Sequence, residues 1–312
     1  MPVIEMKHVT KDYGYGRGIF DVSFEIKKGE VFGFLGPNGA GKTTTIRHLM
    51  GFSKPHEGEL SINGKDCWKA AAIIKYDVGY LPGELAFPKN MTGDQFIKFM
   101  AEERQITDMT HTEELKNIFE LDTSEDIKEM SLGTKRKLAV VTAFMHNPSV
   151  LILDEPTSGL DPVMQERFIQ FILNEKANGK TILLSSHIFS EVDATCDRIA
   201  IIKDGVVVST IEANQLKQST NKAFKIEFSS FQDYQTFLED TKFTIPIKRP
   251  DQNQVKLNLT DEKMQQLFIE LSGVKVNFIS EIKFTLEDYF MDFYDRKKTV
   301  AAGEENLQHG LH

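Results

Sequence analysis

A glycine-rich segment at residues 36–44 has the residue types and spacing to bind phosphate. It follows the apolar run VFGFL and precedes the helical pattern TTTIRHLM. Glycines let the backbone curl around a phosphate and point its N–H groups at the oxygens, beside a helix N-terminus. A lysine and a threonine at the end of the segment suit the β and γ phosphates and Mg²⁺. The residues are Gly36, Pro37, Asn38, Gly39, Ala40, Gly41, Lys42, Thr43 and Thr44.

This order of residues matches the pattern GxxxxGK[ST], and its position between a strand and a helix is the one that the pattern requires. An ordinary glycine-rich turn is the alternative, and it needs neither the lysine nor this context. The segment therefore predicts a binding site for a nucleoside triphosphate, with Lys42 on the phosphates and Thr43 on Mg²⁺.

Two acidic residues, Asp154 and Glu155, directly follow a second apolar run, VLIL. Asp154 is placed to hold Mg²⁺ directly or through water, and Glu155 to orient and deprotonate an attacking water. By itself, such a pair is commonly a solvated strand end. Together with the phosphate-binding segment, it predicts hydrolysis of the bound nucleotide.

The elements that must position these residues are strands buried on both faces. Val31–Leu35, Val150–Leu153 and Thr181–Leu184 are apolar almost throughout, which indicates a parallel α/β sheet. Phe20–Ile26 alternates with period two, as a half-exposed strand does. Asp204 and Gly205 predict a tight hairpin turn between two further strands.

The rest of the chain predicts further divisions. Strand signals vanish between residues 92 and 146, which indicates an inserted helical subdomain. After a polar linker, strand and helix patterns alternate in a stretch that holds ten of the 23 Phe residues and predicts a small α+β domain. Thr285 is placed to cap the last helix of this domain, with Asp288 three residues later as its reciprocal partner. The predicted boundaries are 1–217, linker 218–222, accessory domain 223–295 and disordered tail 296–312.

Composition excludes several classes of protein. The net charge of −9 argues against a nucleic-acid-binding protein, because phosphate contacts need a concentrated basic face. No uncharged apolar run reaches 18 residues and the N-terminus lacks an apolar signal region, so we expect neither a membrane-spanning nor a secreted protein. The two cysteines, Cys67 and Cys196, lie far apart outside any metal-binding pattern, as expected of idle thiols in a reducing cytosol.

Four further motifs follow the phosphate-binding segment in a fixed order. They are VGYLP at 78–82, MSLGTKRKL at 130–138, LDEPTSGLDP at 153–162 and SSH at 185–187. With this series, residues 1 to about 217 resemble the ATP-binding cassette (ABC) family. The resemblance implies a P-loop NTPase cassette with a mainly parallel sheet, an antiparallel β subdomain and a helical subdomain. It also implies ATP and Mg²⁺ as cofactors.

The same resemblance implies roles for single residues. Family members form a head-to-tail homodimer in which the signature positions, here Ser131 and Gly133, contact the partner's ATP. His187 matches the residue that contacts the γ-phosphate, and Asp161 lies in the loop that crosses the dimer. Tyr13 matches the aromatic residue that stacks on adenine, with Tyr15 as a close competitor. Without the resemblance, Ser131 reads as a helix N-cap and Asp161 as a turn residue.

Two departures from the family pattern bear on turnover. Family members usually have Gln after the YLP stretch, where it touches Mg²⁺ and water, whereas this chain has Gly83. The next residue, Glu84, is a candidate to replace it as a metal ligand, since a carboxylate is a good ligand for Mg²⁺. The alternative is a vacant position, because Glu84 is shifted by one residue. Leu132 and Thr134 also replace the Gly and Gln of the common signature.

The ending TLEDYF at 285–290 is similar to that of single-cassette ATPases of drug, bacteriocin and antibiotic-resistance exporters. We therefore expect an ATP-hydrolysing motor subunit of an exporter, in the cytoplasm and held at the inner face of the membrane by separate membrane-spanning permease subunits. Two alternatives stay open. One is a regulatory ATP-binding protein with little turnover, which Gly83 favours. The other is a soluble ABC ATPase outside transport, whose relatives usually carry two cassettes.

Overall fold

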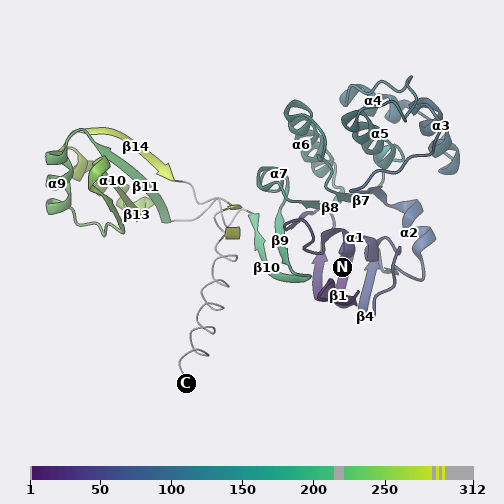
Figure 1. The fold of residues 1–312 in the computed structure, drawn as a ribbon, viewed down its shortest axis with the longest axis horizontal. Coiled ribbons are helices and arrows are strands. Elements are labelled where there is room, and N and C mark those ends of the chain that lie inside the picture. The colour runs from purple at the N-terminus through teal and green to yellow at the C-terminus, as the bar shows by residue number, and fades with distance from the viewer. Residues whose placement is uncertain (1, 214–220, 283–285, 288–289, 292–312) are drawn as a thin grey trace. The chain divides into compact units, whose positions relative to one another are not determined.

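A computed structural model describes residues 2–213, 221–282, 286–287 and 290–291. The chain divides into two compact units, unit 1 over Met1–Ala213 and unit 2 over Asn214–His312 (Figure 1). The predicted capping pair, Thr285 with Asp288, and the predicted tail at 296–312 lie outside the described residues. No helix in the described ranges is long and apolar enough to span a lipid bilayer.

The central sheet of unit 1 has the strand order β10-β9-β3-β8-β7-β6. All neighbouring strands pair in parallel except β9 and β10, which form an antiparallel hairpin. Asp204 and Gly205 both have positive φ in its turn, as predicted. The strands are β3 (Val31–Leu35), β6 (Gly79–Leu81), β7 (Val150–Asp154), β8 (Thr181–Ser186), β9 (Arg198–Lys203) and β10 (Val206–Glu212).

Strands β3, β7 and β8 are buried at every position, which confirms the prediction of a parallel sheet covered on both faces. The chain leaves the carboxyl ends of these strands through loops that lead to helices. Because parallel strands end at the same edge, these loops meet there, and ligands of open α/β sheets bind at such edges. These helices are α1 (Lys42–Leu49), α6 (Pro162–Ala177) and α7 (Phe189–Thr195), whereas α2 (Ala71–Asp77) lies between β5 and β6 in the chain.

A second, antiparallel sheet of unit 1 has the order β2-β1-β4-β5. Its Phe24 ring lies 5.4 Å from that of Phe32 and 5.5 Å from that of Phe34, both on β3. These contacts belong to one continuous apolar core that joins the two sheets. The strands are β1 (Ile4–Asp12), β2 (Gly18–Ile26), β4 (Glu57–Ile62) and β5 (Lys65–Asp66).

Residues 92–146 contain the helices α3 (Gly93–Glu103), α4 (Thr110–Ile118) and α5 (Leu132–Phe144), which lie together in Figure 1. Thr92 and Gln95 form a reciprocal capping box at the start of α3. The Ser131 side chain accepts a hydrogen bond from the Thr134 N–H and so caps α5. The strand pairing described in this segment is a single isolated bridge between Thr92 and Asp126.

Unit 2 follows a βαββαβ pattern with the strand order β12-β13-β11-β14, the split βαβ arrangement. Its apolar core, which includes Phe228, Phe237 and Leu267, is separate from that of unit 1. The elements are β11 (Asn221–Phe228), α9 (Phe231–Asp240), β12 (Ile247–Arg249), β13 (Gln254–Thr260), α10 (Met264–Leu271) and β14 (Val276–Ile282), with 3-10 turns at Pro250–Gln252 and Asp261–Lys263.

Strand β11 begins within the segment that the sequence predicts as linker 218–222. Asn221 pairs with Thr260 and Lys222 with Leu259. An antiparallel strand with one solvent-facing side accepts polar residues, so a polar composition does not by itself exclude a strand. The short strand β12 was missed because its three residues are all exposed and give no apolar alternation.

Candidate functional site

A cavity of about 680 Å³ opens at the carboxyl edge of the central sheet. Elements far apart in the sequence contribute to it: the start of α1, the turn after β6, the end of β7 and the end of β8. Its lining includes six of the predicted site residues, namely Asn38, Thr43, Glu84, Asp154, Glu155 and His187.

The glycine-rich segment leaves the N-terminus of α1 open to an anion. Gly41 is the N-cap residue at φ 110°, a conformation that favours glycine, and no side chain caps this helix. Side chains cap α3, α5, α6 and α9, whereas α2, α4, α7 and α10 lack such a cap as α1 does, so the glycine-rich loop is what sets α1 apart. Uncapped N–H groups and the helix dipole together attract negative charge, and phosphate is the anion for which such loops are built.

Lys42 lies inside this loop, and its side chain is only 5% exposed. Its Nζ donates to the carbonyl oxygens of Gly36 at 2.6 Å and Pro37 at 3.2 Å. It also forms an ion pair with Glu155 Oε1 at 3.0 Å. The ammonium group thus stands between the phosphate-binding loop and the acidic pair at the end of β7.

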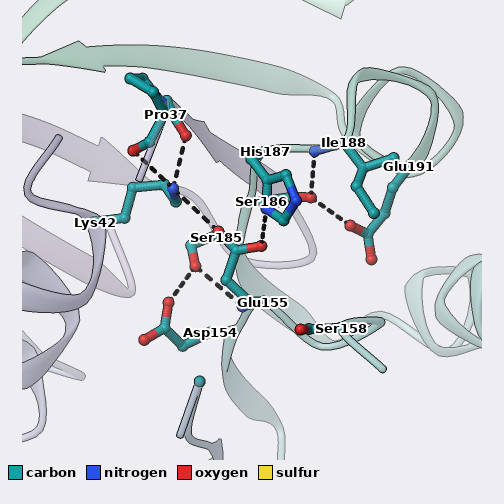
Figure 2. A network of polar contacts seen from close by, with 12 residues as sticks. Pro37, Lys42, Asp154, Glu155, Ser158, Ser185, Ser186, His187, Ile188 and Glu191 are labelled. Carbon is teal, nitrogen blue, oxygen red and sulfur yellow. Dashed lines mark hydrogen bonds and ion pairs between the residues drawn. The ribbon is translucent and has the colours of Figure 1, made fainter. Parts of the chain in front are cut away.

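Glu155 lies between two basic side chains (Figure 2). Its Oε2 contacts His187 Nδ1 at 2.6 Å while its Oε1 contacts Lys42. Its backbone has φ 50°, which is uncommon for a residue with a side chain, and its N–H donates to the Ser185 carbonyl at 3.0 Å. A strained backbone held by surrounding contacts is frequent at functional sites.

Asp154 is completely buried and has one unsatisfied oxygen. Ser185 Oγ donates to Asp154 Oδ1 at 2.5 Å, whereas Oδ2 has no hydrogen-bond partner among the residues that the structure describes. A buried carboxylate oxygen without a donor is costly unless a cation or water meets it. Asp154 and Thr43 line the same cavity with oxygen atoms, which are the ligands that Mg²⁺ prefers. The described residues therefore fit Mg²⁺ at this position.

A buried carboxyl, Glu191, supports the loop that carries His187. Ser186 Oγ donates to Glu191 Oε2 at 2.5 Å and accepts from the Ile188 N–H at 2.9 Å (Figure 2). Burial raises the pKa of Glu191 to about 7, with a smaller contribution from the charge of Glu155. Glu191 was not among the residues predicted from the sequence, although it lies in the first turn of α7, four residues after His187.

Several predicted residues lie outside the cavity. Ser131 and Asp161 are exposed and cap α5 and α6, where Asp161 accepts from the Met164 N–H at 3.0 Å. These backbone hydrogen bonds lower the pKa of Asp161. A Cβ added to Gly133 would lie 3.1 Å from the Gly159 carbonyl oxygen. The first turn of α5 therefore packs closely against the loop that precedes α6.

The predicted adenine-binding residue, Tyr13, is likewise absent from the cavity lining. Its ring is 50% exposed, and its hydroxyl lies 3.4 Å from Ser53 Oγ. The competitor, Tyr15, is 98% exposed. An exposed aromatic ring is available to stack on a base, and of the two only Tyr13 has a described hydrogen-bond partner that orients it.

The position of the missing glutamine lies directly against Asp154. A Cβ added to Gly83 would stand 3.0 Å from Asp154 Oδ2 and 3.3 Å from its Cγ. A side chain at this position would therefore stand in close contact with the Asp154 carboxylate, which must give way slightly to admit it. The carbonyls of Pro82 and Gly83 both accept hydrogen bonds from Arg136, a buried side chain that the sequence analysis did not single out.

Comparison with known proteins supports the resemblance to the ABC family that the sequence motifs indicate. A family model for ABC transporters matches residues 19–158. The bacitracin transport ATP-binding protein BcrA of Bacillus licheniformis is 33% identical over 298 residues, which cover 93% of this chain and 96% of that protein. The linearmycin resistance ATP-binding protein LnrL of Bacillus subtilis is 33% identical over 66% of this chain and 68% of its own length.

Solved structures confirm the predicted fold class. The ATP-binding subunit of an ABC transporter superposes with a TM-score of 0.63 at 29% identity, over 69% of this chain and 92% of the other. A dimeric bacterial ABC transporter cassette gives 0.61 at 24% identity, over 67% and 98%. The resemblance predicted from the motifs is thereby confirmed, and the chain belongs to the ATP-binding, ATP-hydrolysing subunits of ABC transporters.

Proposed function

We propose that this chain is the motor subunit of an exporter and works as a head-to-tail homodimer beneath separate membrane-spanning permease subunits. The observation that carries the proposal is that Asp154, Glu155 and His187 line one cavity, with Lys42 joined to Glu155 by an ion pair at 3.0 Å. Each group has a different task in splitting a phosphoanhydride bond, and all four are in reach of one bound nucleotide.

In this proposal the residues 36–44 and Lys42 bind the phosphates of ATP, with Tyr13 on the adenine. Asp154 and Thr43 hold Mg²⁺, with Glu84 as a further ligand. When bound, Mg²⁺ neutralises the charge that develops on the phosphate oxygens. Glu155 accepts the proton of the attacking water, and His187 keeps the carboxylate oriented through its 2.6 Å contact.

A second copy of the chain would complete the site. Ser131 and Gly133 stand at the N-terminus of α5 outside their own chain's cavity, so they are free to meet the nucleotide of a partner. Leu132 is 61% exposed and Val163, beside Asp161, is 70% exposed. Exposed apolar side chains at these two helix starts are suited to an interface.

The direction of transport and the membrane partners are inferred from the relatives. A bacitracin transport protein and a linearmycin resistance protein are similar to this chain over 93% and 66% of its length, respectively. A probable multidrug transporter protein, YbhF of Escherichia coli, is 34% identical over 70% of this chain. These names favour an exporter subunit that is attached to its permease at the cytoplasmic face of the membrane.

The dimer is tested by size-exclusion chromatography of the Glu155→Gln variant with ATP and Mg²⁺. We expect a stable dimer, because ATP is bound but not hydrolysed. Adding Ser131→Asp should abolish the dimer, since aspartate still caps α5 but its charge repels the γ-phosphate. Ser230→Asp is the matched control, because Ser230 caps α9 in unit 2 in the same way. A monomeric Glu155→Gln protein with bound ATP would contradict the proposed dimer.

A further inference from the structure

Arg136 is a buried cation that the proposed mechanism does not use. It lies near the start of α5, five residues after Ser131, and is 3% exposed. Arginine is almost never buried to this extent unless its charge and its N–H groups are satisfied. Within the described ranges, its hydrogen-bond partners are three backbone carbonyls.

These carbonyls belong to two separate segments beside the cavity. Arg136 Nη1 donates to the Pro82 carbonyl at 2.9 Å and Nη2 to the Gly83 carbonyl at 2.7 Å, both in the turn after β6. Its Nε donates to the Ser158 carbonyl at 3.0 Å, in the loop after Glu155. Because a guanidinium group presents its donors in a rigid plane, the three bonds fix both segments relative to α5.

The clamped turn lies against the buried carboxylate of Asp154. A Cβ on Gly83 would lie 3.0 Å from Asp154 Oδ2, the oxygen without a hydrogen-bond partner among the described residues, so little space separates the turn from this carboxylate. The negative charges of Asp154 and Glu155 also favour the charged form of Arg136 and so offset part of its desolvation. The side chain therefore connects α5 with the position at which Mg²⁺ would be held.

We propose that Arg136 is a positioning residue. It couples the signature at the start of α5 to the Pro82–Gly83 turn of the same subunit, so that a movement of α5 also moves this turn beside the metal ligand Asp154. The inference rests on the proposed function, in which Ser131 meets the partner's ATP. A shift of α5 on that contact then moves Gly83 relative to Asp154. Contact of the signature with one ATP thus alters Mg²⁺ binding in the other site.

Kinetic measurements on Arg136→Gln test this role. We expect the Mg²⁺ concentration for half-maximal hydrolysis to rise about tenfold and kcat to fall by a similar factor, as lost hydrogen bonds to a charged donor imply. KM for ATP should stay within about twofold, because Arg136 does not touch the phosphate loop. The Hill coefficient for ATP should fall towards one. Arg136→Lys should recover part of kcat, since an ammonium reaches fewer carbonyls.

Lys135→Gln is the matched control. Lys135 is the neighbouring residue on α5, and its Nζ donates to the Lys128 carbonyl at 3.2 Å, away from the cavity. We expect this variant to keep the wild-type Mg²⁺ dependence and Hill coefficient. An equal loss in both variants would show a general effect of charge on α5 and would overturn the proposal.

A second measurement tests the three hydrogen bonds of Arg136 independently of the proposed function. In nucleotide-free protein, amide hydrogen exchange around Gly83 and Ser158 should be faster in Arg136→Gln than in the wild type, and unchanged in Lys135→Gln. This result does not depend on hydrolysis or dimer formation. If Arg136→Gln does not fold, Arg136→Lys gives the same readout with the charge retained. Wild-type exchange and a wild-type Mg²⁺ midpoint in a folded Arg136 variant would overturn the inference.

Discussion

At the scale of single residues, the site is held together by one carboxylate shared between two basic groups. Glu155 contacts Lys42 at 3.0 Å and His187 at 2.6 Å. A phosphate in the loop competes for Lys42, because the lysine can turn from the carboxylate to the new anion. In the proposed mechanism, nucleotide binding then leaves Glu155 in contact with His187 alone and free to accept a proton from water.

Glu155→Gln tests the role of this carboxylate. We expect kcat to fall about 100-fold or more, as for loss of a general base, while ATP binding persists. Glu166→Gln on α6 is the matched control, because Glu166 is exposed and contacts Gln170. Steady-state hydrolysis and binding of a fluorescent ATP analogue give the two values. Hydrolysis at the wild-type rate would exclude Glu155 as the base.

Glu84→Ala tests whether this carboxylate replaces the missing glutamine. Glu84 lines the cavity together with Asp154, and we expect its removal to raise the Mg²⁺ concentration for half-maximal hydrolysis several-fold. An unchanged Mg²⁺ titration would show that Glu84 is not a ligand. Partial rescue by Gly83→Gln requires the Asp154 carboxylate to give way slightly, since the added Cβ would lie 3.0 Å from Asp154 Oδ2.

At the scale of elements, the loop from β8 into α7 is supported by the buried carboxyl group of Glu191. Glu191 is 2% exposed, and burial raises its pKa to about 7 from an ordinary value of 4.5. Between these values the folded protein keeps the proton that the unfolded chain has lost. Rising pH therefore lowers the free energy of unfolding by up to about 1.4 kcal/mol per pH unit in this window.

Glu191→Gln should remove this dependence. We expect the variant to gain stability relative to the wild type as pH rises from 4.5 to 7, by roughly 2 kcal/mol in total. Trp68 is the single tryptophan and lies in unit 1, so its fluorescence during urea unfolding reports on that unit. Glu114→Gln, on the exposed side of α4, is the control. A pH-independent difference between Glu191→Gln and the wild type would contradict this account.

The sequence predicted the elements whose pattern is local and missed the contacts that tertiary structure creates. Continuous apolar runs predicted β3, β7 and β8 correctly, because burial on both faces leaves a direct record in the residues. The sequence pattern did not indicate that Arg136 is buried, since an arginine on a helix is usually exposed. Its three carbonyl partners lie 22 to 54 residues away, at distances along the chain that no local pattern encodes.

At the scale of the whole molecule, the two units have separate cores. The apolar clusters of unit 1 and unit 2 share no residue, and the residues assigned to ATP lie before position 190. The predicted domain boundaries remain a prediction. On this division, we expect unit 2 to act on assembly or on contact with the proposed permease rather than on the chemistry.

A chain ending at Lys217 tests the division. We expect ATP affinity within about twofold of the full chain, because the cavity is lined by unit 1 alone. Dimer dissociation in the Glu155→Gln background, measured on both chains by analytical ultracentrifugation, shows whether unit 2 strengthens the dimer. Circular dichroism confirms folding of the shorter chain. Lost nucleotide binding in a folded shorter chain would mean that unit 2 completes the site.

The strand order of unit 2 makes it interchangeable. Ala223 near the start of β11 pairs with Ile282 at the end of β14, so the chain enters and leaves the sheet on neighbouring strands, about 4.8 Å apart. A two-residue turn such as Asn-Gly can bridge that gap. The sheet of unit 2, within residues 223–282, could therefore be exchanged for that of a relative by joining the chain at two adjacent positions. If unit 2 acts on assembly, such an exchange would change assembly while leaving the residues of unit 1 in place.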